Sequence, residues 1–378
     1  MPVGPSASHR ARLLLPLLLA GLLLLPATSV GHLGGAPGSG GPYEPPAPSE
    51  AFKMPRSEQP CPNDHPEWRK AQVVEGVEIQ ESLQCRPDNP ELVAAFVKGT
   101  NNVPQEMLDK NALHEDAVVK GRDLDGDGDP DEINITLEVA ELNGWHLPDD
   151  DLAETYDIAP GIHPSFWVFT PKTTIDHTGP TFFDLARMPS PPIRVEVGDT
   201  VRLTVENTHY FPHTVHLHGV DHPFLTVEGE GNDGVPHISE APILPGEERT
   251  YTLKARQAGS MFYHCHVQPH VHVMMGLGAL FVVEEDREDN WIQTLNPGGG
   301  HVRHPSKAVR ETYDREYDLI YQDFDKELGE IPKSTNDPRE IARLTNRVYD
   351  ATERDSDYFL LNGKSFPYTL RESVVVVG

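Results

Sequence analysis

The chain has 378 residues, and its 36 prolines, 31 glycines and 37% apolar content are typical of a loop-rich β protein rather than a helical bundle. The length allows two or three domains of ordinary size. The formal net charge of -28 argues against a nucleic-acid-binding protein, because binding phosphates needs a basic face.

The N-terminus has the pattern of an export signal. Arg10 and Arg12 precede the apolar run LLLPLLLAGLLLLP, and small residues follow it. The run is broken by proline and glycine and is shorter than a membrane span requires. We therefore predict a signal peptide over residues 1–30, a secreted protein (extracellular or periplasmic) and no membrane span after cleavage; an uncleaved anchor is the alternative. Residues 31–60 are rich in Gly, Pro and Ser and predict a flexible linker.

The cysteine count is odd, which leaves one thiol unpaired in an exported chain. Cys61 and Cys85 lie in the same N-terminal region and could form a disulfide in an oxidising compartment. Cys265 lies between two histidines. A thiol in that position is a candidate metal ligand.

Residues 61–130 predict a mixed N-terminal extension with a helix around the segment PELVAAFVK and an acidic loop, DLDGDGDPDE. The residues at positions 1, 3, 5 and 9 of a calcium loop are Asp123, Asp125, Asp127 and Asp131. Gly128 would form the turn, and Asp129 could offer its carbonyl. Position 12 is Asn134 instead of a bidentate glutamate, so the loop is closer to the aspartate-rich calcium loops of extracellular modules. A solvated acidic turn is the alternative.

From residue 131 onward, short alternating runs separated by turn signals predict an all-β fold, an antiparallel sandwich or barrel. The expected strands of residues 131–287 are EINITLEVAELNG, SFWVFTP, IRVEVGDTVRLTVEN, HTVHLHG, ERTYTLKA, SMFYHCHV and GALFVVEE. Residues 288–312 break the alternation and predict a linker. Residues 313–378 begin a second strand series with EYDLIYQDFD and DYFLLNGKSFPYTL and stop on SVVVVG, which predicts an incomplete second domain.

Two segments, HTVHLHG at 213–219 and HCHVQPHVHVMM at 264–275, concentrate the metal-binding side chains. Side chains alternate between the faces of a strand, so odd and even positions separate these residues into two groups. The first group contains His213 and Cys265, with His270 and a methionine arriving from the following loop. The second group contains four imidazoles, those of His216, His218, His264 and His266.

The two groups predict different metal chemistry. Two histidines, one thiolate and a weak axial methionine form the blue-copper arrangement used for electron transfer. Four imidazoles suit copper, zinc, iron and nickel alike. Because adjacent residues join the second group to the first, copper is the favoured metal for both.

The paired motif HxxHxHG and HCHxxxHxxxxM resembles the multicopper oxidases, which include laccases and ceruloplasmin. The segment HCHVQPHVHVMM is similar to the ceruloplasmin form of the motif. IRVEVGDTVRLTVEN and DGVPHISEAPILPGEERTYTL also resemble the first domain of that family. The resemblance implies a Greek-key cupredoxin domain over 131–287 and the start of a second cupredoxin domain over 313–378.

Carried over by position, the resemblance implies a set of copper ligands. The type 1 ligands would be His213, Cys265, His270 and Met275. His216 would bind the type 2 copper, and the type 3 pair would be bound by His218, His264 and His266. The implied activity is one-electron oxidation of a phenol, an amine or a metal ion at type 1 copper, with dioxygen reduced to water at the trinuclear cluster.

The family's trinuclear cluster needs eight histidines, and this chain has four at motif positions. No HxH pair follows His272. In two-domain members the cluster forms between subunits, so the resemblance implies a homotrimer whose missing histidines lie beyond Gly378.

Other residues near the motifs receive weaker roles. Met275 is favoured over Met274 as axial ligand by its ten-residue spacing from Cys265, which leaves Met274 to packing. Four further histidines are expected on the surface, in a substrate pocket or in support of the ligands: His209, His222, His237 and His272.

Two other functions stay open. A copper-containing nitrite reductase needs no metal-binding histidine after its type 1 cysteine, so His266 argues against that enzyme. An electron carrier or copper-sequestering protein that keeps only the type 1 site is the second alternative.

Overall fold

The computed structural model of the chain describes residues 69–82, 89–146, 151–174, 185–220, 222–308 and 313–371. The chain divides into two compact units, Met1–Lys53 and Met54–Gly378, and every described residue belongs to the second. The signal peptide and linker, Cys61, Cys85 and the segment SVVVVG lie outside the described residues. Within the described ranges, no helix is long and apolar enough to cross a membrane.

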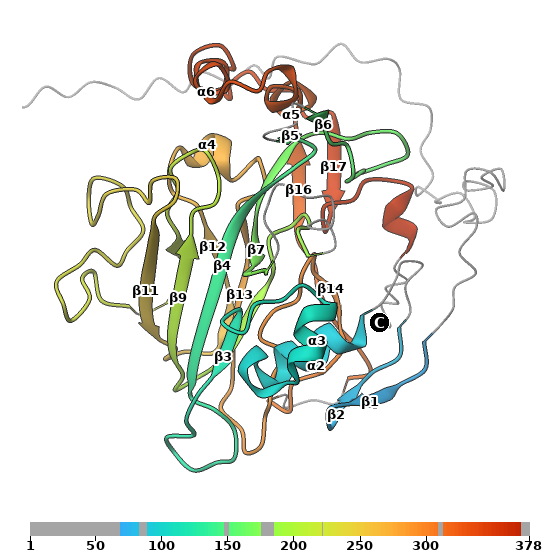
Figure 1. Cartoon of the computed structure of the whole chain (residues 1–378), viewed down its shortest axis with the longest axis vertical. Coiled ribbons are helices and arrows are strands. Elements are labelled where there is room, and N and C mark those ends of the chain that lie inside the picture. Colours follow the sequence, from blue (N-terminus) through green and yellow to red (C-terminus); the bar gives the residue numbers. More distant parts are fainter. Residues whose placement is uncertain are drawn as a thin grey trace, which may run out of the picture. The chain divides into compact units, whose positions relative to one another are not determined.

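Two β-sheets form the centre of the unit (Figure 1). The first has the order β11-β9-β4-β3, with β7 also paired to β4; its strands are β3 (Val118–Lys120), β4 (Glu132–Leu142), β7 (Phe166–Pro171), β9 (Thr200–Glu206) and β11 (Glu248–Lys254). The second has the order β10-β12-β13-β8, with strands β8 (Ile193–Glu196), β10 (His216–Leu217), β12 (Gly259–His264) and β13 (Gly278–Glu284).

Both sheets contribute side chains to one hydrophobic core, in which Ile135 and Leu203 of the first sheet and Tyr263 and Phe281 of the second are fully buried. The pairs β4–β9 and β13–β8 are parallel and the other pairs of the two sheets are antiparallel. The prediction of an all-β sandwich is confirmed, and each predicted strand of residues 131–287 overlaps at least one observed strand.

The N-terminal extension is built onto the first sheet. Its elements are β1 (Gln72–Val74), β2 (Val77–Ile79), α2 (Pro90–Lys98), a 3-10 turn η2 (Thr100–Asn102) and α3 (Gln105–Lys110). Helix α2 forms at the predicted segment PELVAAFVK. It begins there because the Asn89 side chain accepts from Leu92 N–H and Pro90 occupies the first turn. Strand β3 pairs with β4, with Val118 opposite Ile135, so the extension and the sandwich share a sheet.

The region after β13 mixes strands with helices. Its elements are β14 (Gly300–Val302), β15 (Glu316–Asp318), β16 (Tyr321–Phe324), α5 (Lys326–Glu330), η4 (Pro332–Ser334), α6 (Pro338–Arg347), β17 (Tyr358–Leu361) and η5 (Tyr368–Arg371). Two short strands, β5 (Trp145–His146) and β6 (Asp151–Leu152), pair earlier in the chain. The predicted second series contains β15, β16 and β17, whereas helices α5 and α6 were not predicted.

Phe324, Leu328 and Leu360 belong to the same buried core as the sandwich, so residues 313–371 do not have a core of their own. Strand β14 lies inside the predicted linker and pairs with β15. The domain boundaries at 287 and 313 remain predictions.

Arg194 of β8 ties this later region to the second sheet. Its guanidinium is 5% exposed and contacts Glu284 of β13, with Glu316 and Asp318 of β15 each 2.7 Å away. Burial raises the pKa of the Glu284 and Asp318 carboxyls, and the charge of Arg194 opposes that rise. The positive charge of Arg194 therefore balances the negative charges of three neighbouring carboxylates.

Candidate metal centre

Cys265 follows the last residue of β12 and is fully buried. Its Sγ lies 3.3 Å from His272 Nδ1 and 3.6 Å from His213 Nδ1. The three ligand atoms all lie within 4.8 Å of one another, and all three residues are buried. Met275 lies ten residues after Cys265 in the sequence and is also fully buried. Two imidazole nitrogens and a thiolate sulfur form the donor set of a blue-copper site.

The sequence analysis expected His270 beside Cys265, and the structure places His272 there instead. Both residues lie in α4 (Pro269–His272), which Pro269 begins after Gln268 takes a left-handed conformation. Residues two apart on a helix point about 200° apart, on opposite sides. His272 is accordingly 3% exposed and faces Cys265, whereas His270 is exposed.

Burial keeps the groups of this site uncharged in the absence of a cation. It raises the pKa of the Cys265 thiol to about 12 and lowers the pKa of His272 to about 3. The pKa of His213 is also well below its usual range, mainly through burial. The neutral imidazoles keep lone pairs for a metal, and a divalent cation would favour the thiolate. The donor set therefore fits copper.

The second predicted group also comes together. Strand β10 pairs with β12 so that His216 lies opposite His264. The ring centroid of His216 is 5.0 to 5.7 Å from those of His218, His264 and His266, and the ring of His264 is 5.0 Å from that of His218 and 5.6 Å from that of His266. Burial lowers the pKa of His264 to about 4 and also lowers that of His218. Four imidazoles, at least two of them kept neutral by burial, thus gather on the side of the chain opposite the thiol.

Backbone carbonyls orient two of these rings. His264 Nδ1 donates to the Cys265 carbonyl at 2.8 Å, and His216 Nδ1 donates to the Asp233 carbonyl at 2.6 Å. In each ring the opposite nitrogen, Nε2, is left with its lone pair for a metal. His264 Nε2 lies 2.9 Å from His218 Nε2, so these two nitrogens point at a common position.

Asp233 is a supporting residue that the sequence analysis missed. Its carboxylate Oδ1 lies 3.2 Å from His222 Nε2 and 3.7 Å from His216 Nδ1. The loop can come this close because Gly234 has a φ of 75°, and a Cβ there would meet the Val215 carbonyl oxygen at 1.9 Å. The turn signal NDG at 232–234 was the available clue.

The remaining histidines and an aromatic residue surround the thiol. His209 Nδ1 lies 2.9 Å from His213 Nε2, as expected of a supporting residue, and His237 is exposed. Trp167, also missed, packs its ring 5.1 Å from that of His209 and 5.2 Å from that of His272. Trp167 thus packs both against His272, beside the thiol, and against His209, behind His213.

Met274 faces away from the thiol, toward the later region. Its Sδ accepts from Arg354 Nη1 at 2.8 Å, and its carbonyl accepts from Gln322 Nε2 at 2.5 Å.

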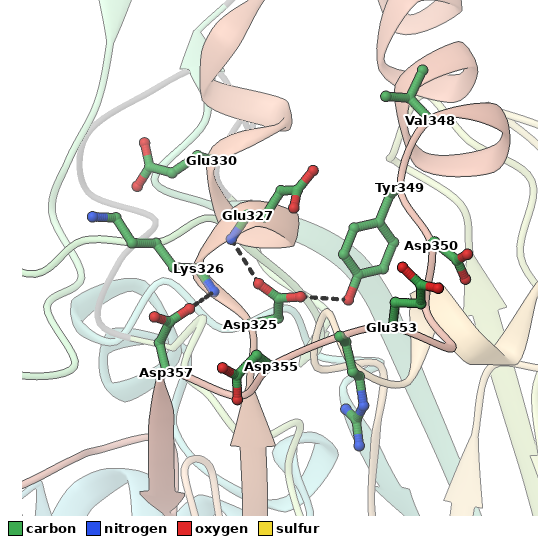
Figure 2. A pocket seen from close by; sticks show the side chains of 11 residues that line it. Asp325, Lys326, Glu327, Glu330, Val348, Tyr349, Asp350, Glu353, Asp355 and Asp357 are labelled. Atoms are coloured by element: carbon green, nitrogen blue, oxygen red, sulfur yellow. Dashed lines mark hydrogen bonds between the residues drawn. The ribbon is translucent and has the colours of Figure 1, made fainter.

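Arg354 is one of the residues that line a pocket of about 580 Å³ (Figure 2). Helix α5, the residue before it and the segment 348–357 after α6 form this pocket. Seven carboxylates line this pocket against one lysine and one arginine. In it, Asp325 accepts from the Tyr349 hydroxyl and from Glu327 N–H.

The acidic loop is only partly gathered. Carboxylate oxygens of Asp123, Asp125 and Asp127 lie within 4.8 Å of one another, and burial, with help from neighbouring acids, raises the pKa of Asp127 to about 6. Asp131 does not join them, because its Oδ2 accepts the backbone N–H groups of Leu124 and Asp125. Three of the four predicted calcium ligands are therefore together.

Comparison with known proteins agrees with this geometry. The family described as "Multicopper oxidase" matches residues 184–288. Laccase 1 of Metarhizium acridum (strain CQMa 102) is 33% identical over 146 residues, 38% of this chain and 22% of that protein. Dihydrogeodin oxidase of Aspergillus terreus (strain NIH 2624 / FGSC A1156) is 34% identical over 111 residues, 29% of this chain and 17% of that protein.

The chain thus spans 22% or less of the length of these relatives. Among solved structures, the multicopper oxidase mgLAC aligns with 62% of this chain and 54% of its own, at 24% identity and a TM-score of 0.40. Copper is the metal that the description of the matched family names, and it fits the donor set around Cys265. Residues 184–288, the part of the chain that matches the family described as "Multicopper oxidase", contain both histidine motifs and the buried thiol.

Proposed function

We propose that this chain is the copper-binding part of an exported multicopper oxidase, which oxidises a reducing substrate by single electrons and reduces dioxygen to water. One observation carries the proposal: the thiol site and the imidazole cluster share the three consecutive residues 264–266. Cys265 points to one side, while His264 and His266 belong to the cluster on the other. A single peptide bond therefore joins Cys265 to each of these two histidines.

The residues divide the work of binding. His213, Cys265 and His272 would hold the type 1 copper, with Met275 as the axial ligand. His216 would hold the type 2 copper, and the type 3 pair would be held by His218, His264 and His266. When bound, copper supplies the one-electron chemistry that couples substrate oxidation to dioxygen reduction. The protein contributes imidazoles that burial keeps neutral and a thiol that is fully buried in the core.

The chain has four histidines at motif positions where the family's cluster has eight, so we propose that the cluster is completed between the subunits of a homotrimer. Exposed apolar side chains support an interface near the cluster. Phe224, Val227 and Ile238 are 49%, 101% and 71% exposed, and they lie on the same loop region as Asp233, which contacts His216.

The substrate belongs to one of three classes: phenols, amines or metal ions. Arg354 lines the acidic pocket and also donates to Met274 Sδ. The carboxylates of this pocket greatly outnumber its cations, so the pocket attracts cations and repels anions. Amines and metal ions are therefore favoured over phenolates.

The test is the copper content, optical spectrum and dioxygen uptake of the purified protein. Four coppers per oxidase unit, an intense blue band and dioxygen uptake with an aromatic amine, a divalent metal ion or a phenol are the expected results. A single copper with a blue band and no dioxygen uptake would refute the oxidase and favour the electron carrier. Reduction of nitrite without dioxygen would instead favour the copper-containing nitrite reductase, even though His266 argues against that enzyme.

We also propose that the acidic loop binds calcium through Asp123, Asp125 and Asp127, which are hard oxygen ligands at alternate positions. Calcium is expected to raise the unfolding temperature of the unmodified chain, since a ligand of the native state stabilises it. Asp125→Asn is expected to lose most of this shift, and the exposed control Asp314→Asn to keep it. Equal shifts in both variants would refute the site.

A further inference from the structure

His209 lies directly behind His213, on the side away from Cys265. Its side chain is 3% exposed, and its Nδ1 is 2.9 Å from His213 Nε2. The backbone N–H of Phe211 donates to the same Nδ1 at 3.4 Å. Two neighbouring groups therefore meet one ring nitrogen.

This double contact fixes where the protons are. A backbone amide can only donate, so His209 Nδ1 is an acceptor and the ring proton of a neutral His209 lies on Nε2. The hydrogen between the two rings must then belong to His213 Nε2. A neutral imidazole has one N–H, so His213 Nδ1 carries the lone pair, and that nitrogen is the one 3.6 Å from Cys265 Sγ.

The surroundings hold His209 in this orientation. Its Nε2 lies 3.6 Å from Glu141 Oε2, and Glu141 Oε1 accepts from Ser165 Oγ at 3.2 Å. The His209 ring packs against Tyr210, with centroids 3.9 Å apart, and against Trp167 at 5.1 Å. The ring is therefore confined by aromatic contacts and faces a carboxylate on its protonated side.

We propose that His209 is a positioning residue that selects the tautomer of His213 and so presents Nδ1 to a metal at the type 1 site. This inference rests on the proposed function for the identity of the metal. Groups that orient a ligand from behind typically contribute roughly 10- to 100-fold to metal affinity. His209 would act in that way through His213, without touching the metal.

Two variants distinguish the hydrogen-bond acceptor role of His209 Nδ1 from the space that the ring fills. In His209→Asn the amide oxygen can take the place of Nδ1 and accept from His213, whereas in His209→Gln the amide reaches the place of Nε2. We expect His209→Gln to bind cobalt(II) roughly 10- to 100-fold more weakly than the unmodified chain, and His209→Asn to bind it nearly as well. The readout is the thiolate charge-transfer band in a cobalt titration, which needs neither dioxygen nor a complete cluster.

The tautomer itself can be observed in the metal-free chain by nitrogen NMR of labelled histidines. His213 is expected to carry its proton on Nε2 in the unmodified chain and in His209→Asn, and to populate the Nδ1–H form in His209→Gln. An Nδ1–H tautomer in the unmodified chain would overturn the inference, as would equal cobalt affinity in the two variants. If the unmodified chain gives no thiolate band with cobalt or copper, the proposed function fails, while the NMR result still decides the tautomer.

Discussion

Replacing His272 by alanine is expected to remove the blue type 1 site, whereas the same replacement at His270 is expected to preserve it. His272 Nδ1 lies 3.3 Å from Cys265 Sγ inside the core, while His270 is exposed on the other side of α4. Losing a direct ligand should reduce copper binding at this site by at least about tenfold, the lower end of what loss of a supporting group costs. The measurement is the copper content and blue absorption of the purified variants.

The two variants are matched controls for each other, since each removes one imidazole from the same short helix. The histidines of the other cluster should keep their copper in both variants, because neither residue contacts that group. Loss of the blue band in His270→Ala together with its retention in His272→Ala would restore the ligand set implied by the family motif. That result would also mean that α4 rearranges when the metal binds.

Alternation along a strand was enough to predict most of this site. It placed His213 with Cys265 and separated both from the four imidazoles, and these groups are found apart in the structure. The alternation stops at Cys265, where β12 has ended and the chain turns into α4. Beyond that point the helical repeat decides which histidine faces inward. Pro269, a residue that favours the first turn of a helix, was the local signal for this change.

Which elements of the fold could be predicted likewise depends on local sequence patterns. The strands of residues 131–287 and helix α2 follow from periodicity and from the Asn89 cap. Helix α6 was missed although Asp337 accepts from Arg339 N–H and Pro338 starts the helix, which is a recognisable capping signal. The partners of Arg194 could not be predicted, because Glu316 and Asp318 are more than 120 positions away in sequence and only packing brings them together.

Arg194→Met is expected to lower the free energy of unfolding by about 3–5 kcal/mol, the usual effect of removing one partner from a buried ion pair. Methionine keeps most of the side-chain volume but leaves Glu284 and Asp318 without their cation. Burial already raises the pKa of both carboxyls, and losing Arg194 would raise it further. A carboxyl whose pKa is higher in the folded state binds more protons there, so folding is favoured as the pH falls. The loss of stability should therefore be largest at pH 8 and smaller at pH 5, as measured by denaturant unfolding.

Arg343→Met is the matched control, because Arg343 is 50% exposed on α6 and pairs only with Glu340 among the ion pairs of the described chain. Exposed pairs of this kind contribute little to stability, so this variant should unfold close to the unmodified chain at both pH values. Equal losses in the two variants, or a loss in Arg194→Met that does not change with pH, would show that the buried carboxylates are not the source of the effect. The difference between the variants thus isolates the electrostatic role of Arg194 in holding β15 against the second sheet.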